Sequence, residues 1–273
     1  MPPLPPQKPA KRITHKDFVR AWLHSAPDPT FKTFTCTVLT EIQNSRSIVE
    51  KALGDALFVH HNDPDTYRQK LAHLGYPATG AALDRRPRSE KTRLANFGEI
   101  LASEFLRQIR GYNIPVYRLR YNCNDESSPK GDDVLAFEFA DKSRGVKDTV
   151  VVAEVKVRSA FRSQAVEEAH DSLSKGHRPR PKSFAFVVDV LFKEGRADEA
   201  KRLLDLSHKF GRRNLTRRSC IFLVTGNAPD KPFETLRSKS RLAPNLETVH
   251  LTLPGLGSFV ASAFEVSVDV NDL

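Results

Sequence analysis

The sequence predicts an α/β protein in which short strands lie between two amphipathic helices. Apolar side chains recur at helical spacing in residues 89–111, a segment that stops at a glycine, and again in residues 163–173. Three runs between these helices are rich in valine, leucine and phenylalanine, as strands are: residues 116–121, 134–139 and 149–157. The predicted order of this part is therefore helix, strand, strand, strand, helix, which is an α/β arrangement.

The N-terminal part is expected to contain a disordered arm followed by a few short elements. Residues 1–12 contain five prolines and three basic side chains and have little to pack, so we expect disorder there. A capping pattern at residues 14–17 opens a helix, and alternating Phe, Thr and Val predict a strand at residues 31–39. Helices are predicted at residues 48–59 and 66–74. The elements after the arm form an α+β module.

A basic segment at residues 80–88 is the predicted linker between two parts of the chain. It contains three arginines and a proline and few large apolar side chains. It divides the chain into an N-terminal α+β module at residues 13–88 and a second domain at residues 89–273.

The C-terminal part is predicted to continue the second domain with helices and strands. The apolar run at residues 184–192 fits either a buried strand or a buried helix, and we favour a helix paired through Gly195 with residues 196–208. Four further elements are expected: strands at 221–225 and 248–253, a short helix at 257–264 and an extended segment at 265–270.

Composition and charge indicate a soluble protein that suits a polyanionic partner. The chain of 273 residues has 43 Lys and Arg against 33 Asp and Glu, a formal charge of +10. Such a charge favours nucleic acid through counter-ion release, although a merely soluble basic protein has the same balance. No apolar run approaches the roughly 18 residues of a membrane span. We therefore expect a cytoplasmic protein with no membrane partner, whose three cysteines are reduced.

Two acidic motifs lie on or beside neighbouring predicted strands. Gly131-Asp132-Asp133 precedes one strand, and Glu154-Val155-Lys156 lies inside the next. Because side chains alternate across a strand, Glu154 and Lys156 share a face. The same alternation puts the two aspartates of the first motif on opposite faces, so only one of them can bind the same ion as Glu154.

A second Glu-x-Lys triplet, Glu199-Ala200-Lys201, shows that the triplet alone proves little. Its surroundings have helical periodicity, and residues two apart on a helix point in nearly opposite directions. Only the strand-borne triplet is therefore a candidate for metal chemistry.

The strand-borne set has the groups that phosphodiester hydrolysis needs. Carboxylates from the first motif and from Glu154, with the carbonyl of Val155, form a hard oxygen site suited to Mg²⁺ or Mn²⁺. Lys156 would position or help to deprotonate the attacking water. Glu99 on the preceding helix is a further candidate, or equally a solvated acid on a helix surface. The alternative for the set is an exposed ion pair at a strand edge, worth under about 1 kcal/mol.

These motifs resemble the PD-(D/E)xK nuclease superfamily. The resemblance rests on Gly98-Glu99 in the first helix, Gly131-Asp132-Asp133 before the second strand and Glu154-Val155-Lys156 in the third, in the order of that superfamily. It implies a restriction-endonuclease-like core with a mixed central sheet flanked by helices. It also selects Asp133 over Asp132 as the acid that acts with Glu154, Lys156 and Glu99. The superfamily's nominal proline is absent here.

A narrower resemblance is to the HamA family, the nuclease subunit of the Hachiman antiphage defence system. It rests on the Gly-Glu helix, the segment Tyr117-Arg118-Leu119-Arg120, the Gly-x-Asp motif and the helix at residues 164–173, and it covers residues 90–260. This resemblance implies a superfamily 2 helicase partner and DNA degradation during infection.

Two basic clusters are candidates for nucleic-acid binding. One comprises Lys209, Arg212, Arg213, Arg217 and Arg218, and the other includes Arg178 and Arg180. The alternative is a pair of charged loops that keep the protein soluble. His60-His61 with Asp63 could suggest zinc, but adjacent residues rarely bind one ion, so a helix end is favoured. No P-loop or dinucleotide fingerprint is present.

The sequence therefore predicts a Mg²⁺-dependent deoxyribonuclease with little sequence preference. Asp133, Glu154 and Lys156 carry this prediction together with the positive charge. The main alternative is a non-catalytic DNA-binding or helicase-docking subunit with a nuclease-like fold. A basic scaffold with no nucleic-acid role is a third possibility, and it predicts no salt-dependent DNA binding.

Overall fold

The computed structural model of the protein describes residues 13–74, 83–127, 130–141, 143, 145, 147–174, 180–212 and 214–273. The predicted arm at residues 1–12 and the first part of the predicted linker lie outside these residues. So do Arg178 and Arg213 of the predicted basic clusters.

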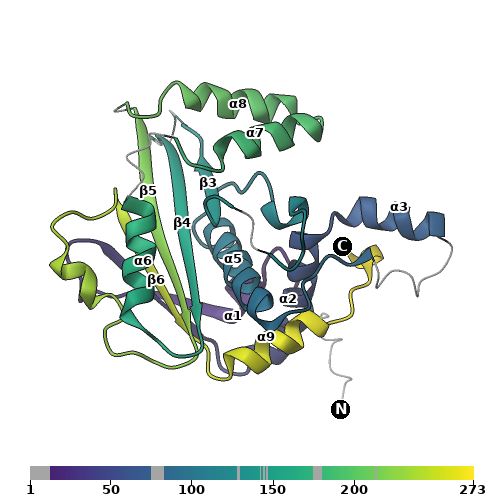
Figure 1. The fold of residues 1–273 in the computed structure, drawn as a ribbon, viewed down its shortest axis with the longest axis horizontal. Coiled ribbons are helices and arrows are strands. Elements are labelled where there is room, and N and C mark those ends of the chain that lie inside the picture. The colour runs from purple at the N-terminus through teal and green to yellow at the C-terminus, as the bar shows by residue number, and fades with distance from the viewer. Residues whose placement is uncertain are drawn as a thin grey trace, which may run out of the picture.

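Within the described residues, six strands form one mixed sheet in the order β1-β2-β6-β5-β4-β3. The two outer pairs, β1 with β2 and β3 with β4, are antiparallel, and the inner pairs are parallel. The strands are β1 (Leu23–Pro27), β2 (Thr35–Glu41), β3 (Val134–Glu138), β4 (Asp148–Arg158), β5 (Leu215–Thr225) and β6 (Leu246–Thr252). β4 and β5 are the longest strands and run side by side through the middle of the molecule (Figure 1).

Helices cover both faces of the sheet (Figure 1). The α-helices are α1 (Phe18–Trp22), α2 (Ser45–His61), α3 (Pro64–Leu74), α5 (Glu90–Gln108), α6 (Ser163–Ser174), α7 (Phe184–Lys193), α8 (Ala197–Ser207) and α9 (Leu256–Glu265). Short 3-10 helices lie at Arg118–Tyr121, Glu234–Ser238 and Val270–Asp272.

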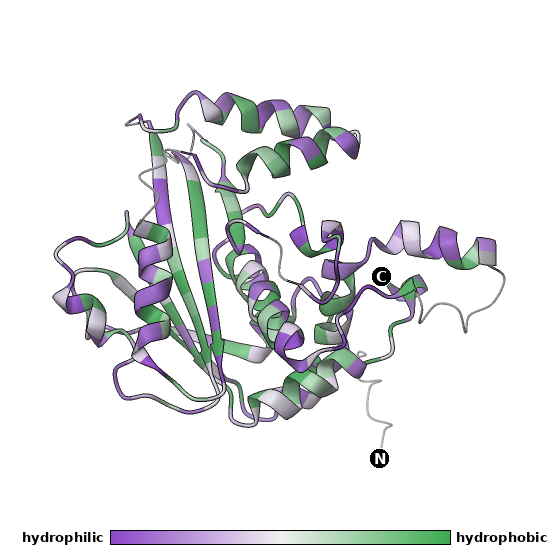
Figure 2. Cartoon of the chain, in the orientation of Figure 1, coloured by the Kyte–Doolittle hydropathy of each residue, from purple (hydrophilic) through white to green (hydrophobic). Residues whose placement is uncertain are grey.

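The sheet separates two hydrophobic cores, and strand alternation decides which residue enters which core. Val151 and Ala153 of β4 belong to the core shared with α1, α2, α5 and α9. Val150 and Val152 belong to the core shared with α6, α7 and α8. The central strands are accordingly hydrophobic along most of their length (Figure 2). Both faces of the central strands are thus buried, as is usual for parallel strands.

Several sequence predictions are confirmed by these elements. Ser89 caps α5 by accepting a hydrogen bond from the Thr92 N–H, and the helix is followed by Gly111 in a left-handed conformation. The ambiguous run at residues 184–192 is a helix, α7. Its buried side chains recur at helical spacing, and its apolar residues also occupy other faces of the helix. The turn at Gly195, with φ +75°, joins it to α8.

The strand predicted at residues 116–121 is wrong. Arg118–Tyr121 form a 3-10 helix, and the consecutive side chains of Arg118 and Leu119 are both buried. On a strand with one buried face, consecutive side chains alternate between core and solvent, so both could not be buried. On the side of β3 away from β4, the described residues contribute only an isolated bridge, between Asn113 and Phe137.

Other boundaries differ because pairing extends beyond the apolar runs. β5 begins at Leu215, six residues before the predicted start at residue 221. The basic N-terminal half of β5 is a strand because it pairs with β4. β2 begins at Thr35, whereas Phe31 and Phe34 stack on each other at 4.9 Å and fill the core. β1 was not predicted, because its sequence LHSAP lacks strand-forming residues.

The described residues before Ser89 share the sheet and the core of the rest. β2 pairs with β6, so the N-terminal strands extend the same sheet. Trp22 of α1 contacts Phe97 of α5 at 6.5 Å between ring centroids. The division into modules at residues 13–88 and 89–273 stays a prediction, and the structure joins the two parts through this packing.

None of the described helices combines the length and the apolar character that a membrane crossing requires.

Candidate active site

Asp133 and Glu154 face each other where β3 begins. The pairing of β3 with β4 starts at Val134 opposite Ala153, which places Asp133 opposite Glu154 just beyond the ladder. The Val155 N–H donates to Asp133 Oδ2 at 2.8 Å. Within the described residues, β4 from Glu154 to Arg158 has no strand partner on this edge. The end of β4 therefore borders an opening.

The Val155 carbonyl faces the same opening. The N–H and C=O of one strand residue point to the same side of the strand, and the Val155 N–H is directed at Asp133. If β3 continued, the Asp132 N–H would face this carbonyl, but it donates to Ser183 Oγ at 2.9 Å. Two carboxylates and one carbonyl are thus directed to one edge.

Asp132 points away from this site, toward the start of α7. Its Oδ2 accepts a hydrogen bond of 2.8 Å from the Ser183 N–H, so the two residues bond reciprocally. Gly131 makes the turn possible, since its φ of +129° strains other residues and a Cβ would lie 2.5 Å from Ser183 Oγ. This geometry separates the adjacent aspartates, with Asp133 on the side of Glu154.

Lys156 lies on the same face as Glu154 and donates to it. The distance from Lys156 Nζ to Glu154 Oε1 is 2.8 Å, and their side chains are 18% and 15% exposed. Both line a cleft of about 480 Å³ between the first half of α5 and the end of β4. Lys91 and Arg158 also line it and add positive charge. The ion pair is therefore half-buried in a cleft whose lining contains both acidic and basic side chains.

Glu99 enters the cleft from α5. Its neighbour Gly98 allows α5 to approach β4 closely, since a Cβ there would lie 2.3 Å from Val157 Cγ2. Burial raises the pKa of Glu99 to about 8, the guanidinium of Arg118 at 3.9 Å opposes this increase, and the charge of Asp133 adds to it. Glu99 is thus a carboxyl group that holds its proton near neutral pH.

Asp133 is also perturbed. Burial raises its pKa to about 6 and the Glu154 carboxylate adds to the increase, while the Val155 N–H, Lys156 and Arg118 oppose it. Two carboxylates held close together in a partly buried site repel each other, and a divalent cation relieves that repulsion.

The donor set fits Mg²⁺ or Mn²⁺ with few protein ligands. Among the residues that the structure describes, no three side chains of the His, Cys, Asp or Glu type are placed to hold one metal ion. Asp133, Glu154 and the Val155 carbonyl remain as hard oxygen donors. Mg²⁺ commonly binds one or two carboxylates and keeps several waters, so this set suits it.

Comparison with known proteins agrees with the motif pattern. The model of the HamA family matches residues 16–265. The chain belongs to the HamA family. It is similar to the Hachiman protein HamA of Bacillus cereus, with 33% identity over 182 residues, which is 66% of this chain and 62% of that relative. The match thus spans less than two thirds of the relative's length.

In this HamA family member, the described residues of the predicted basic cluster, Lys209, Arg212, Arg217 and Arg218, do not all lie on one face. Lys209 Nζ binds the Asp148 carboxylate at 2.5 Å. Arg217 and Arg218 are consecutive in β5, so their side chains leave opposite faces of the sheet. Arg212 is exposed, and Arg180 lies over the Phe184 ring at 5.7 Å. Nucleic-acid binding by these residues stays a prediction.

The second triplet is arranged as its helical position predicts. On α8, Glu199 binds Arg196, whereas Lys201 Nζ lies 3.9 Å from Asp198. Gln164 on α6 is exposed and donates to Glu168.

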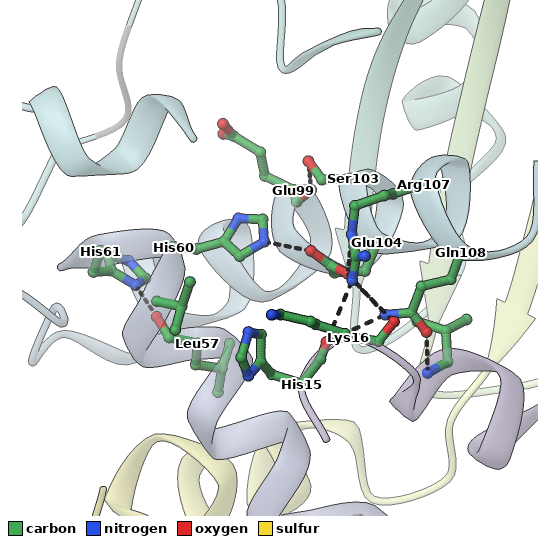
Figure 3. A network of polar contacts seen from close by, with 12 residues as sticks. His15, Lys16, Leu57, His60, His61, Glu99, Ser103, Glu104, Arg107 and Gln108 are labelled. Atoms are coloured by element: carbon green, nitrogen blue, oxygen red, sulfur yellow. Dashed lines mark hydrogen bonds and ion pairs between the residues drawn. The ribbon is translucent and has the colours of Figure 1, made fainter. Parts of the chain in front are cut away.

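His60 and His61 take part in a buried hydrogen-bond network between α2 and α5. His60 Nε2 lies 2.8 Å from Glu104 Oε1, and Arg107 and Gln108 donate to the other oxygen of Glu104. His61 Nδ1 lies 2.7 Å from the Leu57 carbonyl oxygen. Figure 3 shows this network, with the Glu99 carboxylate directed away from it. These histidines therefore join the two helices, in agreement with the predicted helix end.

Sequence reasoning missed two residues of the site. Arg118 is 5% exposed and lies beside Glu99. The sequence placed it in a predicted strand and gave it no role at the site. Ser183 holds the first acidic motif from 50 residues away along the chain, and no local pattern signals that contact. An arginine inside a run of apolar residues was the one available signal.

Proposed function

We propose that this protein is a metal-dependent nuclease that hydrolyses DNA phosphodiester bonds with little sequence preference. The observation that carries the proposal is the placement of Asp133 opposite Glu154, with Lys156 bound to Glu154 in the same cleft. The mixed sheet with helices on both faces supports the finer inference of a restriction-endonuclease-like core.

Each residue has a role that its position supports. Asp133, Glu154 and the Val155 carbonyl would hold Mg²⁺ or Mn²⁺, which when bound stabilises negative charge on the phosphate. Lys156 donates a hydrogen bond beside these donors and would orient the attacking water. Glu99, which is neutral when protonated, would donate a hydrogen bond to a phosphate oxygen without repelling it. Lys91 and Arg158 in the cleft wall would attract the DNA backbone.

The family supports a biological setting for this reaction. Membership of the HamA family and similarity to a Hachiman protein support a role in antiphage defence. We infer that the protein acts there with a superfamily 2 helicase partner. The helicase would supply unwound DNA, which suits a nuclease without a groove-reading motif.

One observation favours a second candidate, a DNA-binding or helicase-docking subunit that does not cleave. Glu99 lines the same cleft, but within the described residues no three side chains of the His, Cys, Asp or Glu type are placed to hold one metal ion. Such a subunit would bind DNA equally well with and without metal and would leave it intact.

The test compares two triplets of identical pattern. Purified protein is incubated with plasmid and with single-stranded DNA in Mg²⁺, Mn²⁺ or chelator, as wild type, Glu154→Ala and Glu199→Ala. We expect metal-dependent cleavage by wild type and Glu199→Ala, and a loss of at least about a hundredfold in Glu154→Ala, as for the loss of a group that stabilises transition-state charge. Cleavage by Glu154→Ala at the wild-type rate would refute the assignment.

A partner requirement is separated from the absence of catalysis by the same three proteins. Where the isolated chain does not cleave, the assay is repeated with the co-expressed helicase of the same system and ATP. Metal-independent DNA binding without cleavage in both assays would favour the binding subunit.

A further inference from the structure

A second cleft lies on the far side of the 3-10 helix Arg118–Tyr121. It measures about 630 Å³ and is bordered by the start of α3, this 3-10 helix and the turn between α7 and α8. Six residues of its lining matter here: Tyr67, Lys70, Arg85, Arg120, Tyr121 and Arg196. This cleft, called the Tyr121 groove below, has no part in the chemistry described above.

The Tyr121 groove is positively charged. Its lining contains four basic side chains against two carboxylates, Asp63 and Glu194. The lining also contains a histidine, His61. Burial lowers its pKa to about 4, so its ring is neutral at physiological pH. The groove therefore attracts anions.

Backbone carbonyls and carboxylates together hold these arginines in place. Arg85 forms an ion pair with Asp125, Arg120 with Asp63, and Arg196 with Glu194 and Glu199. Arg85 donates to the carbonyls of Arg120 and Asn122 as well as to Asp125. Arg120 donates to the Val59 carbonyl at 2.7 Å. Arg196 donates to the Pro115 carbonyl at 2.7 Å. The carboxylates offset part of the charge. Arg120 donates through Nε and Nη1, and its Nη2 is a further donor for a phosphate oxygen.

An exposed aromatic ring, that of Tyr121, lines this groove, and a second, that of Phe186, contacts it. Tyr121 is 37% exposed and Phe186 on α7 is 36% exposed, and their ring centroids are 6.0 Å apart in a T-shaped contact. Exposed aromatic rings next to fixed cations suit a ligand that has both flat bases and phosphates. A single nucleic-acid strand presents both, whereas a duplex hides the faces of its bases.

The groove adjoins the candidate active site. Arg118 and Tyr121 are one turn apart in the 3-10 helix, roughly 6 Å along its axis. Arg118 lies beside Glu99 at 3.9 Å, whereas Tyr121 lines the groove. A strand that stacks on Tyr121 therefore passes close to the cleft that contains Asp133 and Glu154.

We propose that the Tyr121 groove binds single-stranded DNA next to the cleavage site, with bases stacked on Tyr121 and Phe186 and phosphates near Lys70 and Arg120. The inference deepens the proposed nuclease function and rests on it. It names the substrate class as a single strand, and it names a surface other than the basic clusters that the sequence suggested.

The experiment measures binding of a fluorescent single-stranded oligonucleotide, and of the matching duplex, to the full chain in chelator, where no cleavage occurs. Tyr121→Ala, Phe186→Ala and Lys70→Glu are each expected to weaken single-strand binding about tenfold, as base stacking and phosphate contacts predict. Lys70→Glu should also reduce the salt dependence by about one counter-ion or more. Duplex binding should change less.

Two variants serve as controls. Lys201→Glu reverses the charge of an exposed lysine on α8, whose side chain is 68% exposed, and should bind as wild type does apart from the small general effect of net charge. Tyr121→Phe keeps the ring and should retain binding. Phe186 is exposed, so Phe186→Ala should leave the melting temperature unchanged and remains informative if Tyr121→Ala unfolds.

The outcomes separate this inference from the nuclease proposal. If the Tyr121, Phe186 and Lys70 variants bind single strands as tightly as Lys201→Glu does, the groove assignment is overturned, whatever the cleavage assay shows. If they lose single-strand binding while wild type shows no metal-dependent cleavage, alone or with the helicase and ATP, the groove stands and the nuclease proposal fails.

Discussion

Asp132 and Ser183 hold each other through reciprocal hydrogen bonds in the interior of the protein. The Asp132 N–H donates to Ser183 Oγ at 2.9 Å, and the Ser183 N–H donates to Asp132 Oδ2 at 2.8 Å. This pair connects the start of α7 to the turn that presents Asp133. The position of Asp133 against Glu154 therefore depends on a contact that no part of the Glu154-Val155-Lys156 triplet makes.

Removal of the Asp132 carboxylate should displace Asp133. Asp132→Ala leaves the buried Ser183 N–H without its acceptor, which costs about 1–3 kcal/mol of unfolding free energy. Asp132→Asn keeps an acceptor oxygen and should retain most of that stability. Urea unfolding and Mn²⁺ titration measure the two effects, and we expect Mn²⁺ affinity to fall about tenfold in the alanine variant only. Wild-type Mn²⁺ affinity in a destabilised Asp132→Ala would limit this pair to a structural role.

Gly98 should not tolerate alanine, although it lies inside a helix. Helix propensity favours alanine by about 1 kcal/mol, but its Cβ would lie 2.3 Å from Val157 Cγ2 and 2.9 Å from Val155 Cγ1. Overpacking of this kind costs about 1–3 kcal/mol and pushes α5, with Glu99, away from β4. Urea unfolding should therefore show a less stable Gly98→Ala protein.

The double variant Gly98→Ala with Val157→Ala tests the cause. It removes the side chain that the new methyl group meets, so it should be more stable than the sum of the two single changes predicts. Strict additivity would mean that the contact between α5 and β4 is not what excludes alanine.

The sequence predicted the acidic motifs well because strand alternation is a local property. Glu154 and Lys156 share a face for that reason alone, and the structure has them 2.8 Å apart. Arg118 and Ser183 were missed because their contacts join segments that are distant in sequence. β1 was missed because its pairing with β2, and not its own residues, makes it a strand. Local patterns thus predicted the candidate metal ligands, and tertiary contacts decide how those side chains are held.

Metal binding should weaken as the pH falls below about 6. The pKa of Asp133 is raised to about 6 by burial and by Glu154, so protons compete with the metal for this carboxylate below that value. The expected loss is about tenfold in affinity for each pH unit. Mn²⁺ titration by calorimetry between pH 5 and pH 8 measures it.

Asp133→Asn provides the control for this pH effect. An amide side chain does not gain or lose charge between pH 5 and pH 8, so the variant should bind Mn²⁺ weakly and with little dependence on pH. A wild-type affinity that is constant from pH 7 to pH 5 would contradict the involvement of Asp133.

Acid should destabilise the fold through two buried histidines. Burial lowers the pKa of His61 and of His250 to about 4 in each case. In the unfolded chain these rings gain a proton near pH 6.5, so between about pH 6.5 and pH 4 the unfolded state binds more protons. Stability is complete above pH 6.5 and falls as the pH falls toward 4, by up to about 3 kcal/mol for each histidine.

Substitution of one of these rings should flatten that dependence. His250→Gln, whose side chain can still reach the Thr225 hydroxyl that lies 2.9 Å from the His250 ring, should show a smaller loss of urea midpoint between pH 7 and pH 4.5. The exposed His24→Gln is the matched control and should keep the wild-type slope, because it removes a histidine that is not buried. If both variants lose stability with pH as steeply as wild type, the acid sensitivity comes from the carboxylates, with Glu104 the first to examine because it forms an ion pair with Arg107.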